Sequence, residues 1–111
     1  MIFIPDFYLS EPLEEQTMKF AFIIMNQFDP AADRAEIHNG DACIIGVSNL
    51  EQACTVAREM QAKGIGCIEL CGAFGEAGAK AVIEATGNQI PIGFCTHLPE
   101  QDEIYAEAFG K

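Results

Sequence analysis

Four short apolar runs, spaced by segments long enough to hold a helix, constrain the fold of this chain more than any other feature. The runs are Phe20–Met25, Ala42–Val47, Cys67–Cys71 and Ile90–Thr96. Continuous apolar runs of this length, bounded by turn residues, are typical of strands buried on both faces of a parallel sheet. We therefore predict a small, mainly parallel four-stranded sheet.

The segments that follow the second and third runs each predict a helix. Ser48 and Glu51 have the S-x-x-E spacing of a capping box, and the apolar stripe that follows ends at Lys63-Gly64, a typical helix C-terminus. The glycine-rich turn 72–78 leads into the second helix, which Gly87-Asn88 closes.

A third helix is expected at the C-terminus. Pro99 suits its first turn, and acidic residues follow it where the positive end of the helix dipole favours them. Its predicted buried face consists of Ile104, Tyr105, Ala108 and Phe109. With the polar segment 26–41 taken as a loop, the predicted class is α/β and the element order is β-β-α-β-α-β-α.

The order of the strands in the sheet decides how its two faces are covered. If the second, third and fourth strands lie side by side in sequence order, right-handed crossovers put every helix on one face. The other face would then be bare and would require a partner chain. If the first strand inserts into that order, helices can cover both faces. Because a domain of this size buries only a modest fraction of its surface, we expect a homo-oligomer.

Charge and cysteine usage narrow the functional class. Seventeen Asp and Glu against six Lys and Arg give a net charge of -11, which disfavours nucleic acid and anionic membranes as partners. The five cysteines form no regular disulfide framework, which predicts a reduced, cytoplasmic protein. Nothing in the composition identifies a cofactor.

Residues 1–17 differ in character from the rest of the chain. They contain four acids, no base and two prolines, and a fresh start at Met18 runs directly into the first apolar run. We interpret 1–17 as an N-terminal extension outside the native fold and 18–111 as one domain. The alternative is an arm that packs Phe3, Phe7 and Tyr8 onto a neighbour.

Four segments carry a resemblance to a known family. They are KFAFIIM (19–25), IIGVSNLEQAC (44–54), GIGCIELCGAFGEAGAKAVIEATGN (64–88) and PIGFCTHLPEQD (91–102). They resemble a family of short, uncharacterised bacterial proteins known only as a domain of unknown function. The resemblance implies a compact α/β domain over Met18–Gly110, and it implies no activity, cofactor or catalytic residue.

The carboxyl ends of parallel strands are where open α/β sheets bind ligands. His97 ends the fourth run and is one of two titratable imidazoles, although it can equally cap the third helix. Glu69 lies inside an apolar run, where burial would raise the pKa of its carboxyl group; an edge strand or a wetted interface explains it as well. Cys71 precedes a helix and is a candidate thiolate, although an inert buried cysteine is the simpler interpretation.

Two further groups are candidate ligand-binding residues. Gly72, Gly75 and Gly78 resemble a phosphate-binding turn at a helix N-terminus, but tight packing explains the glycines equally well. His38 and Asp41, in the long loop, would close over the site as a lid; His38 as a surface residue is the simpler interpretation. A metal held by both histidines and Asp41 or Glu69 is a further possibility.

These candidates lead to one functional hypothesis and one rival. The hypothesis is a small-molecule-binding protein or small enzyme whose site lies at the carboxyl ends of the strands. The rival is a non-catalytic, oligomeric assembly protein in which the same residues are structural.

Overall fold

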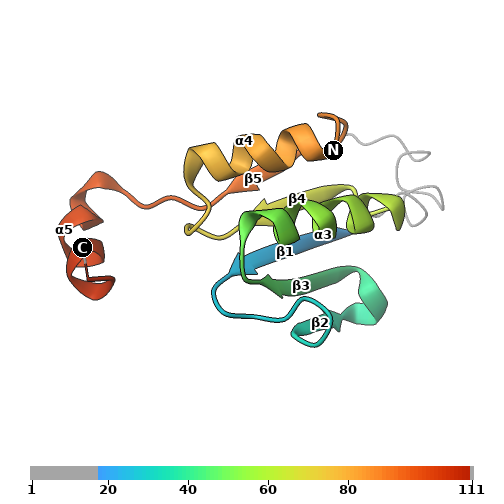
Figure 1. The fold of residues 1–111 in the computed structure, drawn as a ribbon, viewed down its shortest axis with the longest axis horizontal. Helices are drawn as coiled ribbons and strands as arrows, with labels where there is room; N and C mark the ends of the chain where they lie inside the picture. Colours follow the sequence, from blue (N-terminus) through green and yellow to red (C-terminus); the bar gives the residue numbers. More distant parts are fainter. Residues whose placement is uncertain (1–17, 111) are drawn as a thin grey trace, which may run out of the picture.

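One mixed sheet organises residues 18–110, the part of the chain that the computed structural model describes (Figure 1). Its strands are β1 (Phe20–Met25), β2 (Arg34–Ile37), β3 (Ala42–Val47), β4 (Cys67–Leu70) and β5 (Ile92–Phe94). They lie in the order β2-β3-β1-β4-β5, and all are parallel except β2, which pairs antiparallel with β3. Residues 1–17, with the predicted extension, lie outside the described residues.

The α/β class is confirmed, but the sheet has five strands rather than four. The additional strand, β2, lies in the segment that we expected to be a loop. Its four residues are all exposed, because it is an edge strand paired on one side only. An exposed edge strand carries no apolar run, so hydrophobicity gives no signal for it.

Three α-helices follow the strands, as predicted. They are α3 (Leu50–Ala62), α4 (Gly75–Ala85) and α5 (Asp102–Ala108), with single 3₁₀ turns η1 (His38–Gly40) and η2 (Pro99–Gln101). The predicted capping box is wrong by one residue. Asn49, not Ser48, caps α3 by accepting the Gln52 N–H at 2.8 Å, and the Gln52 side chain accepts the Ser48 N–H at 2.7 Å. No helix in the described part of the chain has the length and apolarity needed to cross a membrane.

Both long helices lie on the same face of the sheet. The first strand does insert, between β3 and β4, the arrangement in which helices can cover both faces, but α3 and α4 do not use the second face. The crossovers from β3 to β4 and from β4 to β5 move across the sheet in the same direction, so their common right-handed sense puts α3 and α4 side by side (Figure 1). The core fills the space between these helices and the sheet; its largest fully buried side chains are Ile23, Ile45, Val47, Ile68, Leu70 and Val82.

The other face of the sheet, here called the open face, is apolar, and no described helix covers it. One row of neighbouring residues across the strands runs Ala35, Ile44, Phe22, Glu69, Gly93. The next row runs Ile37, Ala42, Phe20, Cys67. Successive side chains of β1 point to opposite faces of the sheet and differ in burial. Ala21 and Ile23, on the helix side, are fully buried, whereas Phe20, on the open face, is 49% exposed.

Helix α5 does not pack on the domain. The segment after β5 leads away from the sheet, and α5 stands apart from the other elements (Figure 1). The prediction of a buried face on this helix is therefore wrong for the described chain: Ile104 is 58% and Phe109 73% exposed. The residues do form an apolar stripe, as the periodicity indicated, but the stripe contacts no part of the sheet.

Gly46 provides a test of packing on the open face. A Cβ at this position would lie 2.6 Å from both Cβ and Cγ of Phe28, and a Cβ contact cannot be relieved by moving the end of the ring. We expect Gly46→Ala to lower the free energy of unfolding by about 1–3 kcal/mol, measured by urea denaturation. Gly72→Ala is the matched control, because its Cβ would meet only the Cys95 carbonyl oxygen at 3.6 Å. Equal stability of the two variants would contradict the packing described here.

Candidate functional site

Glu69 lies on the open face rather than in a cleft at the strand ends. Its carboxylate covers Gly93 of the neighbouring strand, where a Cβ would lie 2.6 Å from Oε1. The thiol of Cys67, on the same face, lies 3.8 Å from the Glu69 Oε2. Burial, and secondarily the charge of Glu69, raise the pKa of Cys67. The side chain of Glu69 is exposed, so the burial that would have favoured a general base is not present at this position.

Cys71 sits at the end of β4, beside the end of β1. Its sulfur accepts the backbone N–H of Met25 at 3.3 Å, and its own N–H is bonded to the Ile23 carbonyl at 3.1 Å. The side chain is half-buried against the core. Cys71 thus joins two strand ends, and it faces different surroundings from Glu69.

His97 belongs to the C-terminal segment rather than to the rim of the sheet. Its Nε2 lies 2.7 Å from the Asp102 Oδ1, in the first turn of α5. Its ring packs on Tyr105 with centroids 3.8 Å apart, and Tyr105 stacks in turn on Phe109. Strands β4 and β5 do run parallel and adjacent, as a shared pocket requires, but Glu69, Cys71 and His97 have different partners and do not converge.

Of the three glycines predicted to form a turn before the second helix, only Gly72 precedes α4, and Gly75 and Gly78 lie in its first turns. Gly75 has a φ of +64°, a conformation that side chains disfavour. Gly78 is buried, and a Cβ there would lie 3.1 Å from that of Phe74. Gly72 has only an ordinary contact with the Cys95 carbonyl. Backbone conformation and close packing therefore account for Gly75 and Gly78 without an anion.

His38 and Asp41 lie at the opposite end of the sheet from Cys71. His38 begins η1 and Asp41 follows it, immediately before β3, and β3 starts beside the start of β1. The two side chains are 3.6 Å apart, but they cannot close over the carboxyl ends of the strands. Within residues 18–110 no three His, Cys, Asp or Glu side chains are grouped closely enough to hold a metal ion.

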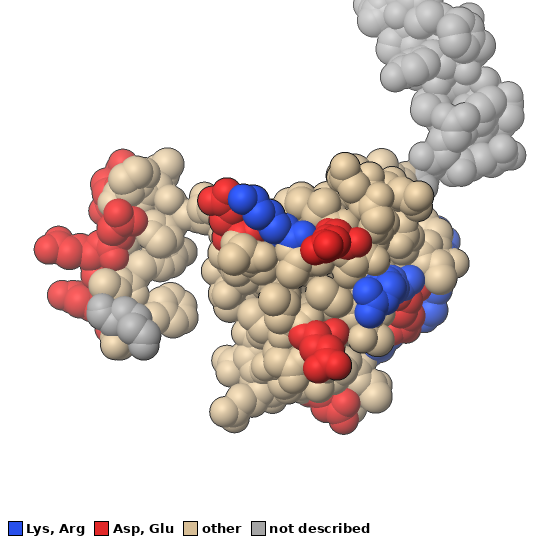
Figure 2. Space-filling view, turned by 45° about the horizontal axis from the view of Figure 1, so that its top comes forward, with Lys and Arg blue, Asp and Glu red and all other residues tan. Residues whose placement is uncertain are grey.

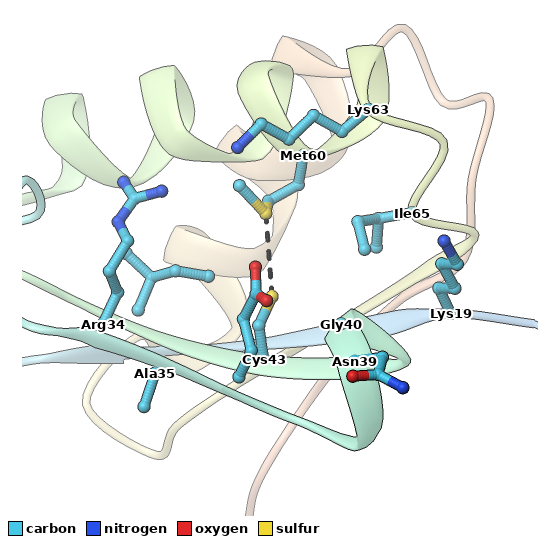
Figure 3. Close-up of a pocket in the computed structure, with 11 residues that line it drawn as sticks. Lys19, Arg34, Ala35, Asn39, Gly40, Cys43, Met60, Lys63 and Ile65 are labelled. Carbon is cyan, nitrogen blue, oxygen red and sulfur yellow. Dashed lines mark hydrogen bonds between the residues drawn. The ribbon is translucent and has the colours of Figure 1, made fainter.

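A different site emerges at this opposite end, on the helix side of the sheet. A pocket of about 210 Å³ lies between the edge strand β2, the start of β3 and the C-terminal end of α3 (Figure 3). Three of the six Lys and Arg residues line it: Lys19, Arg34 and Lys63. This is a cationic concentration in a chain whose net charge is -11.

Glu59 of α3 organises two of these cations. Its two carboxylate oxygens accept hydrogen bonds from the two terminal nitrogens of Arg34, at 2.9 and 3.3 Å, and one of them forms an ion pair with Lys63 at 3.3 Å. The Arg34 hydrogen bond, followed by that of Lys63, lowers the pKa of Glu59. The pair fixes the edge strand to the helix, and it leaves both cations at the mouth of the pocket.

The floor of the pocket is apolar. The Sγ of Cys43 lies 3.8 Å from the Sδ of Met60, and Ile65 adjoins them (Figure 3). Burial, and then the nearby charge of Glu36, raise the pKa of Cys43, so this thiol stays neutral at pH 7. Glu36 also lines the pocket, which adds one acid to the three cations.

Sequence reasoning missed this site because its residues come from separate segments of the chain with no motif spacing. The scattering of Lys and Arg along the chain conceals that the fold gathers three of them. The one available signal is the mixed stretch Arg34-Ala35-Glu36, whose alternation indicates a strand with both charges on one side.

The family model that matches this chain is that of the family of unknown function DUF6506, and the match extends over residues 18–110. The chain belongs to this family. The DUF6506 match agrees with the resemblance carried by the four sequence segments. No curated protein and no solved structure matches this DUF6506 chain.

The ion pair at the pocket mouth makes stability depend on pH. Because the folded-state pKa of Glu59 is lowered, its contribution is complete above the unfolded-state pKa of about 4.3 and is lost as the pH falls through the lower folded value. The side chains of Arg34 and Glu59 are both about one-third exposed, so this ion pair contributes at most about 1 kcal/mol to the free energy of unfolding. We expect Glu59→Gln to be less stable than wild type at pH 7 and to approach it near pH 3, in urea titrations. A difference that grows toward low pH would contradict this account.

Proposed function

We propose that this protein binds a small organic anion, a carboxylate or phosphate compound with a short apolar part, in the pocket lined by Lys19, Arg34 and Lys63. The observation that carries the proposal is the convergence of half of the chain's cations on one concave site in a strongly acidic protein. This keeps the small-molecule hypothesis and moves its site away from the carboxyl ends of the strands.

The chemistry of the lining suits such a ligand. Arg34 gives its two terminal nitrogens to Glu59 and its Nε–H to the Pro30 carbonyl, which leaves one further N–H on each terminal nitrogen, and the positive charge, for a ligand oxygen. Lys63 reaches across Met60 toward the Arg34 side of the pocket, and Lys19 stands at the other side (Figure 3). The neutral Cys43 and Met60 below them provide a surface for apolar atoms.

Pocket size and charge restrict the ligand. A volume of about 210 Å³ lies below the roughly 300–1,000 Å³ of sites for drug-sized molecules, which favours a compact metabolite over a nucleotide. Glu36 and the C-terminal end of α3 both disfavour an excess of negative charge. A ligand with one or two anionic groups therefore fits better than a polyanion.

Thermal denaturation with a panel of acetate, malonate, citrate and inorganic phosphate at constant ionic strength tests the proposal. A ligand present at 100 times its dissociation constant stabilises the fold by about 2.7 kcal/mol, a rise in Tm of roughly 10 °C or more in a domain of this size. We expect Lys19→Ala and Lys63→Ala to reduce that rise. Lys80→Ala is the matched control, because Lys80 pairs with Glu76 on the exposed side of α4.

Glu59→Gln sharpens the test because it acts on affinity and stability in opposite directions. The substitution releases Arg34 and Lys63 from their carboxylate partner, so we expect tighter anion binding in spite of the lower stability of the ligand-free protein. Isothermal titration at pH 7 with the best anion of the panel measures this. No response of the wild-type protein to any anion, together with unchanged behaviour of the Lys variants, would refute the proposal.

The rival function, an assembly protein, is favoured by a separate observation. The open face of the sheet is apolar, and exposed apolar patches of that extent are typical of interaction surfaces. The two functions are compatible, because the cationic pocket lies on the helix side of the sheet and the open face lies on the other.

A further inference from the structure

The chain carries two apolar surfaces that no described element covers. One is the open face, with Phe20, Ile37 and Ile44 exposed. The other is the stripe on the C-terminal arm, which we define as residues 96–110 and which consists of the segment after β5, η2 and α5. The stripe is formed by Leu98, Ile104, Tyr105 and Phe109.

The side chains of the arm contact one another, but the arm does not pack on the sheet or on the other helices. His97 bonds Asp102 and stacks on Tyr105, which stacks on Phe109, so the stripe is already assembled. All described residues of the arm are exposed. A helix of seven residues is marginal in water without packing, so α5 requires an apolar partner.

The polarity of α5 fits a helix that lies on a flat apolar surface. With a turn of 100° per residue, Ile104, Tyr105 and Phe109 fall on one side. The acids of the arm are Glu100, Asp102, Glu103 and Glu107, and Figure 2 shows acidic side chains on the side of the arm that is turned away from the body. Packing through the stripe would therefore leave most of the acids in solvent.

The open face offers a matching depression. A hollow of about 360 Å³ lies over strands β1, β2 and β3, with the segment before β2 as its wall. Its lining is mainly apolar and includes Ile24, Phe28, Ile44 and Gly46. A hollow of this size can take one or two aromatic side chains.

We propose that two copies of this chain exchange C-terminal arms, each laying the stripe of its α5 into the hollow on the open face of the other. The arm of one chain extends away from its own sheet (Figure 1), so the hollow on a second copy is the surface it meets. A two-fold axis repeats the contact, so the stripes of both chains and the hollows of both chains are filled at once.

The surface area that this contact would bury is typical of a stable dimer. The five strands have three to six residues each, 23 in all, which at about 4.8 by 3.3 Å per residue gives roughly 360 Å² a face. Covering two such faces buries roughly 1,450 Å² when both sides are counted, within the range of about 1,200–2,000 Å² for stable interfaces. The arm adds η2 and the segment before it to the surface that α5 supplies for this contact.

Association of the full-length wild-type chain is the first readout, measured by light scattering and native mass spectrometry at about 10 μM. We expect a dimer. Phe109→Glu on the arm and Ile44→Glu on the open face each put a charge into the apolar contact twice per dimer, and we expect each to raise the dissociation constant at least about 100-fold. Ala106→Glu, on the far side of α5, and Leu50→Glu, on α3, are the matched controls and retain the dimer.

Mixing the two defective variants separates arm exchange from simple stacking of the two sheets. In a mixed dimer, the intact arm of the Ile44→Glu chain meets the intact open face of the Phe109→Glu chain, so one of the two contacts is whole. We expect the equimolar mixture to form heterodimers, identified by mass, at a concentration where each variant alone is monomeric. Stacked sheets would give no such recovery, because the charge on one face would lie in every contact.

Three results would overturn the proposal. One is a monomeric wild-type chain at 100 μM. The second is a dimer that Phe109→Glu leaves intact, which would mean that something other than the arm, such as residues 1–17, covers the open face. The third is the absence of heterodimers when both single variants are monomeric. Cooperative urea unfolding and a circular dichroism spectrum that retains the signal of the α/β domain confirm that both variants remain folded, and their urea midpoints fall below that of wild type because they lack the stabilisation by association.

Discussion

The handedness of the two βαβ crossovers is the constraint on which the rest of this structure depends. Both connections move across the sheet in the same direction, and each is right-handed, so α3 and α4 must share one face. Everything apolar on that side becomes core, with Ile23, Ile45 and Leu70 among its fully buried side chains. The apolar side chains on the other side remain on the surface, and neither α3 nor α4 covers them.

The composition of the open face is unusual for a sheet surface that faces solvent. Strands that face a helix layer and strands that face solvent normally differ in composition, because a solvated face alternates with polar residues. Here β1 has Phe20, Phe22 and Ile24 on the uncovered side. A C-terminal helix whose stripe is equally exposed is the natural complement to that face within the same gene product.

The helix side has a different character because charge, not apolar area, dominates its edge. Arg34 reaches from the edge strand to Glu59 on α3, which fastens a strand whose four residues are all exposed. The same pair concentrates cations around a pocket with a neutral sulfur-lined floor. A structural ion pair and a candidate anion site thus share residues, and this links the stability of the edge strand to the affinity of the pocket.

The sequence alone determined the α/β class, the four strands that carry apolar runs and the three helices, because burial on both faces and helical periodicity leave a local record in the residues. It could not reveal β2, whose Arg34–Ile37 segment is exposed throughout, nor where the stripe on α5 would pack. The tertiary structure alone decided which side chains meet. Glu69 lies within β4, and Cys71 and His97 follow two adjacent strands, yet side-chain direction and the departing arm separate them. Lys19, Arg34 and Lys63 converge from distant segments. Local hydrophobicity largely decides which segments form strands. Which side chains meet in a site depends on the order and direction of the strands in the sheet, and packing across the whole chain sets that order.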